Sequence, residues 1–167
     1  MTWVKLHLMI NHFPIILTLV GTGACVVGAA RRARQAWTYG ALTLALAGAC
    51  AVPVWITGNQ SHIVLEDELG VPEGVVEPHE LIAEATMWIM IPMGALAAFA
   101  WWRAGQEPRR GPSPAWVWQS LLATGVAGSA MIGYTALLGG RIAHNATTIE
   151  AMRSDSARAS PKAPVPR

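Results

Sequence analysis

Apolar and polar residues along this chain are arranged in blocks, with short polar stretches separating long apolar ones. Four apolar blocks are long enough to cross a bilayer, which takes roughly 20 predominantly apolar residues in a helix. They cover about residues 6–30, 37–57, 81–102 and 115–138, and Glu84 is the one acidic or basic residue within them. The pattern predicts an all-α fold, an integral membrane four-helix bundle over residues 1–146.

The composition agrees with a membrane protein. The 167 residues are 53% hydrophobic and 13% charged, whereas a soluble domain has about 25% charged residues. Most of the eight tryptophans fall near the ends of the predicted spans, where the indole ring favours the membrane–water interface. We therefore expect a multi-pass membrane protein, in direct contact with the lipid bilayer.

The charges of the connecting segments predict the orientation of the bundle. The first and third connections each carry three arginines, whereas the second, residues 58–78, has five acidic residues and neither Lys nor Arg. Because short cytoplasmic loops are enriched in Lys and Arg, the first and third connections are expected in the cytoplasm. Both termini then lie on the outer (periplasmic) side.

The last segment, residues 147–167, is rich in Pro, Ala, Ser and Arg. A segment of this composition cannot bury enough apolar surface to fold alone. It is expected either to be disordered or to become ordered against a partner.

All five histidines lie toward the predicted membrane face that carries the termini: His7, His12, His62, His79 and His144. Ionisable side chains within a membrane usually face the bundle interior or a wet cavity, and they often mark functional sites. We expect His12, His79 and His144 to converge, since they come from three different spans. His7 and His62 are interpreted as ordinary interfacial residues.

Several neighbours are expected to support this cluster: Asn11, Pro14, Gly139, Gly140 and Arg141. Pro14 has no backbone N–H, so the first span should kink or restart beside His12. The two glycines would let the fourth helix approach a neighbouring helix or a flat ligand. Arg141 could pair with a haem propionate.

Three kinds of site fit these residues. One b-type haem at most could be held by two neutral histidines, because histidines occur near only one face. Alternatively, Cu or Zn could be bound by the three imidazoles with Glu80 or Glu84 nearby. The third possibility is a hydrogen-bonded cluster that joins the helix ends and binds no cofactor.

Four short motifs carry a resemblance to a known family: NHFPI in the first span, PVWITG at the end of the second, PHE before the third and LGGRIAH after the fourth. In this order they resemble a bacterial family of four-helix membrane proteins catalogued as domain of unknown function 2231, or a close branch of it. Similar domains occur fused or adjacent to c-type cytochrome modules. The resemblance therefore implies redox partners, among them a c-type cytochrome, and a location in the bacterial inner membrane.

Together these features predict a membrane protein of an electron-transfer chain that binds one haem or a metal on the periplasmic side. The alternative is a cofactor-free accessory subunit of a larger respiratory or photosynthetic complex. The sequence contains no recognisable nucleophile motif, phosphate-binding loop or nucleic-acid surface, so we expect neither an enzyme nor a nucleic-acid partner.

Overall fold

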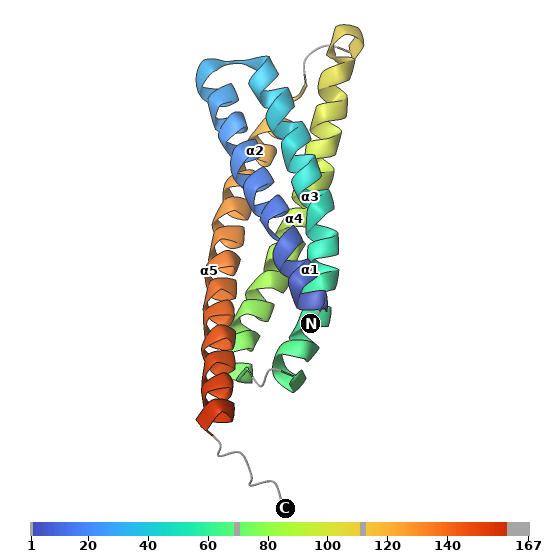
Figure 1. Cartoon of the computed structure of the whole chain (residues 1–167). Helices are drawn as coiled ribbons and strands as arrows, with labels where there is room; N and C mark the ends of the chain where they lie inside the picture. The colour runs from blue at the N-terminus through green and yellow to red at the C-terminus, as the bar shows by residue number, and fades with distance from the viewer. Residues whose placement is uncertain (1, 69–70, 111–112, 160–167) are drawn as a thin grey trace, which may run out of the picture.

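The computed structural model of this protein describes residues 2–68, 71–110 and 113–159. These residues form α-helices and one short π-helix: α1 Thr2–Ile10, α2 His12–Arg31, α3 Arg34–Ile63, η1 Val64–Glu68, α4 Glu73–Arg110 and α5 Ala115–Ala159. Only Asn11 separates α1 from α2, so the two together make the first long helical segment. The predicted all-α bundle of four long helical segments is confirmed (Figure 1).

Each of the four segments is long and apolar enough to cross a membrane. The candidate spans are Trp3–Arg31, Arg34–Asp67, Glu73–Glu107 and Ala115–Asn145. They extend beyond the apolar blocks predicted from the sequence because a helix satisfies its backbone hydrogen bonds internally and can continue through polar residues.

The helices form a closed bundle in which each long segment packs against the next, and α5 returns to pack against α2. The α2–α3 and α4–α5 connections lie at one end of the bundle (Figure 1). The start of α1, the α3–α4 connection and the end of α5 lie toward the other end, which we call the termini end.

Helix α5 continues to Ala159, so residues 147–159 of the predicted tail are helical. This stretch contains Ala, Met, Glu and Arg, which favour helix, and it contains no proline. The remainder of the predicted tail, residues 160–167, lies outside the described residues.

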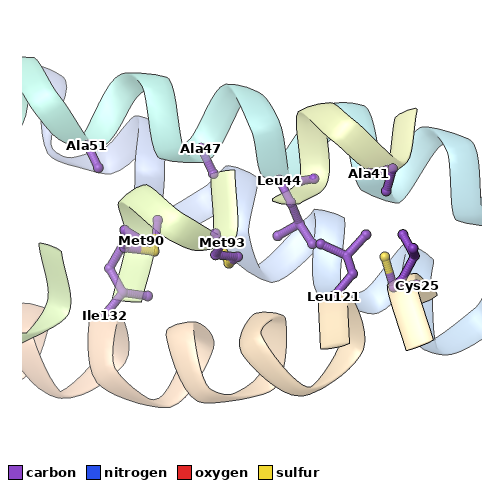
Figure 2. Close-up of a cluster of buried hydrophobic side chains, with 12 residues drawn as sticks. Cys25, Ala41, Leu44, Ala47, Ala51, Met90, Met93, Leu121 and Ile132 are labelled. Atoms are coloured by element: carbon purple, nitrogen blue, oxygen red, sulfur yellow. The ribbon is translucent and has the colours of Figure 1, made fainter. Parts of the chain in front are cut away.

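The core is built mainly from small and sulfur-containing side chains (Figure 2). Met90 and Met93 are fully buried together with Leu44 and Leu121, and alanines fill many of the remaining core positions. Helices α3 and α4 approach each other closely: a Cβ atom built on Gly48 would lie 2.7 Å from the Cα of Gly94. Without side chains at these two positions, the helix backbones touch.

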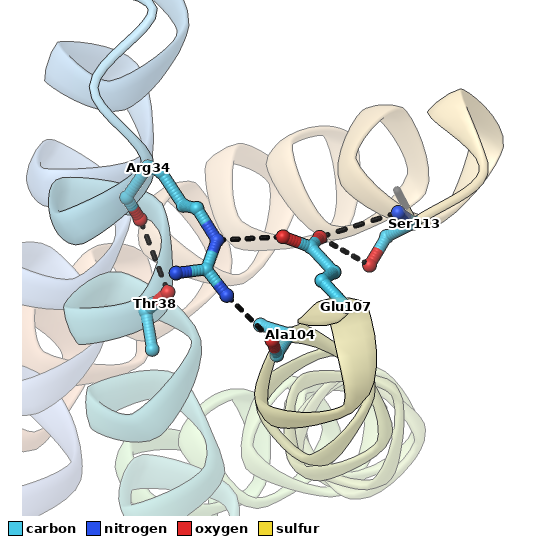
Figure 3. Close-up of polar contacts among 5 residues, drawn as sticks. All are labelled: Arg34, Thr38, Ala104, Glu107 and Ser113. Atoms are coloured by element: carbon cyan, nitrogen blue, oxygen red, sulfur yellow. Dashed lines mark hydrogen bonds and ion pairs between the residues drawn. The ribbon is translucent and has the colours of Figure 1, made fainter. Parts of the chain in front are cut away.

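At the end opposite the termini, polar contacts around Arg34 tie α3 to α4 (Figure 3). Its Nε donates to Oε2 of Glu107 at 2.6 Å, and its Nη2 donates to the carbonyl oxygen of Ala104 at 2.6 Å. Glu107 Oε1 in turn accepts from the hydroxyl of Ser113 at 2.8 Å, just before α5 begins. The contacts hold the ends of three helices together.

The Arg34→Ala variant is expected to lower the free energy of unfolding by less than about 1 kcal/mol. The Arg34 side chain is 59% exposed, and exposed ion pairs contribute little to stability. Thermal unfolding in detergent, with Glu107→Gln as the matched variant, measures the effect. A loss of several kcal/mol in either variant would contradict this description of the contact.

Candidate cofactor site

His79 lies in the second turn of α4 and reaches across to α5. Its Nδ1 is 3.0 Å from the carbonyl oxygen of Thr135. A Cβ on Gly139 would lie 3.2 Å from the Cε1 of His79, so the glycine makes room for the ring against α5. Because a carbonyl oxygen can only accept a hydrogen bond, Nδ1 carries the proton in the neutral ring and Nε2 keeps its lone pair.

Nearby contacts hold the acceptor of this bond in place. The Thr135 hydroxyl donates to the carbonyl oxygen of Met131 in its own helix at 2.9 Å. It also lies 2.8 Å from the hydroxyl of Thr86 on α4. The position of His79 is therefore fixed by a hydrogen-bonded contact between two packed helices.

His7 is held in the same way on the other side of the bundle. Its Nδ1 is 3.1 Å from the carbonyl oxygen of Val54 on α3 and 3.3 Å from the hydroxyl of Thr57. A Cβ on Gly58 would lie 3.1 Å from the Cε1 of His7. The bond to the carbonyl again places the proton on Nδ1 of the neutral ring and leaves Nε2 as an acceptor.

Both imidazoles are half-buried, one on α1 and the other in the second turn of α4. A histidine that binds a metal usually donates its other N–H to a carbonyl or carboxylate, which fixes the tautomer and the ring orientation. His7 and His79 both have this arrangement, with Nδ1 against a carbonyl oxygen of a neighbouring helix. Each ring therefore keeps a lone pair on Nε2 with which it could bind a metal.

The structure does not bring the three predicted histidines together in the interior. His12 is exposed, and its Nδ1 is 3.1 Å from the carbonyl oxygen of Leu8 in the same helical segment. His144 is also exposed and lines a shallow hollow on α5 together with Arg141 and Gly140. Of the three, only His79 is half-buried between helices.

The predicted metal cluster with carboxylate ligands is likewise not formed. Glu84 is exposed, and Glu80 Oε1 lies 2.8 Å from Nδ1 of His62. The other nitrogen of His62 is 2.9 Å from Oε1 of Glu66, so both of its ring nitrogens face carboxylates. Within the described part of the chain, no three His, Cys, Asp or Glu side chains are placed to hold a metal ion.

The helical phase of the first long segment turns His7 toward the bundle and His12 away from it. Pro14 and Thr18 are buried, and His7 and Asn11 continue the same stripe at intervals of four and three residues. His12 lies five residues after His7, which rotates it by about 140° at 3.6 residues per turn. The direction of the side chain, which this phase sets, decides which histidine faces the bundle interior.

Asn11 and Pro14 lie at the break between α1 and α2. The helical hydrogen-bond pattern is interrupted at Asn11, between the end of α1 at Ile10 and the start of α2 at His12, while the Asn11 backbone itself stays helical. The Oδ1 atom of Asn11 is buried and has no hydrogen-bond partner among the described residues. A buried acceptor without a partner is costly, so this atom marks a place where a bound group or water would be stabilising.

Comparison of the chain with known protein families, with curated proteins and with solved structures yields no match. The resemblance described from the four short motifs remains a prediction.

Proposed function

We propose that this protein is a membrane-embedded electron-transfer protein that binds one b-type haem at its termini end, where His7 and His79 would hold it. The observation that supports this most strongly is the matched pair of imidazoles, each with Nδ1 held by a carbonyl oxygen of a neighbouring helix. When bound, haem supplies a reversible one-electron iron couple whose potential depends on its axial ligands and surroundings.

The donor set favours haem over Cu or Zn. A structural zinc site takes four protein ligands and a catalytic one usually three, but only two imidazoles are arranged here. A haem iron needs only two, because the macrocycle supplies the other four nitrogen ligands. The unpartnered Oδ1 of Asn11 lies one helical turn beyond His7, where it could accept a hydrogen bond from water or another donor beside the bound group.

The proposed location is the bacterial inner membrane with the termini end in the periplasm, as the arginine-rich connections indicate. There the haem would exchange electrons with other subunits of a respiratory or photosynthetic chain, a c-type cytochrome among them. The acidic second connection would favour a partner with a basic surface, because complementary charge steers association.

The optical spectrum of the full-length protein tests this function. The chain is produced with an adequate haem supply and purified in detergent, and its spectrum is recorded before and after reduction with dithionite. We expect a Soret band, a sharp α-band on reduction, and one haem per chain. Elemental analysis for iron, copper and zinc accompanies the spectrum.

Either of two results would contradict this proposal. Stoichiometric copper or zinc without haem would favour the metal site. A colourless protein without any of the three metals, which also takes up no added hemin, would favour the cofactor-free accessory subunit.

A further inference from the structure

The first and third long segments bury the same pattern of positions. In α2 the buried residues are Pro14, Thr18, Gly21, Thr22, Cys25 and Gly28. In α4, six buried residues each lie 72 positions further along the chain: Thr86, Met90, Met93, Gly94, Ala97 and Ala100. The side chains differ, but the spacing of the buried face is the same.

The second and fourth segments correspond in the same way, with a shift of 81 positions. Six of the buried residues of α3 are Gly40, Leu44, Ala47, Ala51, Thr57 and Ser61. Their counterparts in α5 are also buried: Leu121, Gly125, Gly128, Ile132, Leu138 and Ile142. The shift grows from 72 positions for the first helix of each half to 81 for the second. The second half therefore has nine more residues between its two helices than the first half has.

The two histidine contacts obey the same two shifts. His79 lies 72 positions after His7, and its acceptor Thr135 lies 81 positions after Val54. The glycines that make room for the two rings, Gly58 and Gly139, are also 81 positions apart. In each half, the histidine is thus held by a backbone carbonyl and lies against a glycine at equivalent positions.

Contacts between the halves are those expected of a two-fold axis along the bundle. Near such an axis, a residue meets its own counterpart. Trp37 packs against Trp118, 81 positions later, with ring centroids 5.1 Å apart. The Thr18 hydroxyl lies 3.8 Å from the sulfur of Met90, 72 positions later.

Away from the axis, contacts occur as equivalent pairs. Gly48 meets Gly94 where α3 packs on α4. The counterparts of these residues, Ser129 and Thr22, meet where α5 packs on α2, with the Ser129 hydroxyl 3.1 Å from that of Thr22. The α3–α4 and α5–α2 interfaces therefore have the same register but different side chains.

We infer that the chain is a tandem repeat of one helix hairpin, residues 3–62 and 75–143, and that His7 and His79 form a single shared binding site on its pseudo-two-fold axis. Each hairpin contributes one imidazole, so neither half has a complete site. The site takes one metal-centred planar ligand per chain, held by two equivalent nitrogen donors. The identity of that ligand as haem rests on the proposed function, whereas the repeat does not.

Cross-linking tests the repeat without any cofactor. In full-length protein with Cys25→Ala and Cys50→Ala, cysteine pairs replace His7 and His79, or Thr18 and Met90, and a short bifunctional maleimide is added. We expect efficient intramolecular cross-links for both pairs. The control pair at Leu8 and Glu80 is also 72 positions apart but turned from the axis, and it should react far less. Failure of both axial pairs, or equal reaction of the control, overturns the repeat.

Titration with hemin tests the shared site. The parent chain should bind one hemin, and His7→Ala and His79→Ala should weaken binding to a similar extent. Gly58→Ala and Gly139→Ala should each weaken it by about tenfold, the lower range for residues that orient a ligand, since each added methyl crowds one ring. Gly23→Ala, which has open space around it, should have no effect.

The two experiments separate the possible failures. Hemin binding that depends on only one of the two histidines overturns the shared site and leaves a haem function standing. No hemin uptake by the parent chain overturns both the ligand pair and the proposed function, while intact cross-links would preserve the repeat.

Discussion

Replacing either His7 or His79 with alanine is expected to reduce haem affinity by at least about 100-fold. Loss of a residue that merely orients a metal ligand costs 10- to 100-fold, so loss of an axial ligand should cost more. Both side chains are only half-buried, and removing either leaves the helix backbones intact. Hemin titration followed at the Soret band measures the affinity.

The other histidines provide matched controls for this result. His12 and His144 are exposed, and His62 is engaged by two carboxylates. Alanine at any of these positions should leave haem affinity within about threefold of the parent, because ligand orientation effects begin near tenfold. A large loss of haem affinity in the His12→Ala variant, with no loss in His7→Ala, would contradict this result and favour the cluster expected from the sequence.

Substituting valine for Gly48 is expected to destabilise the bundle strongly. A Cβ at this position would lie 2.7 Å from the Cα of Gly94 and 2.9 Å from the carbonyl oxygen of Met90. Both are backbone atoms of α4, so the two helices must move apart. We expect a loss of about 3 kcal/mol, the upper part of the range for overpacked cores, measured by reversible unfolding in mixed detergent.

Gly133→Val serves as the control, because a Cβ at Gly133 meets no atom within 4 Å. Both variants place a β-branched residue in the middle of a long helix, so their intrinsic helix propensities change equally. Equal stability of the two variants would contradict the close backbone contact between α3 and α4.

The four long helices could be predicted from sequence because length and apolarity alone decide which segments can cross a bilayer. The internal repeat could not. Equivalent core positions in the two halves hold residues of very different size. Gly21 corresponds to Met93, and Leu44 corresponds to Gly125. What the halves share is the spacing of the buried face, which becomes visible only when burial is known.

The candidate site shares only His79 with the cluster expected from the sequence. The concentration of histidines toward one end directed attention to the same end of the bundle. His7 was missed because its value as a ligand depends on two contacts that no local pattern encodes: a carbonyl of Val54 and the open face of Gly58, about 50 residues away. Tracing the interior stripe back from Pro14 through Asn11 would have reached His7 and excluded His12.

The electron paramagnetic resonance spectrum of the oxidised haem-loaded protein tests most directly whether His7 and His79 bind the same iron. Two axial imidazoles give low-spin ferric haem, so the parent protein should show a low-spin signal and no substantial high-spin signal. His7→Ala and His79→Ala should each convert the bound haem to the high-spin form. A high-spin parent, or a low-spin signal that persists unchanged in either variant, would contradict a haem shared by these two histidines.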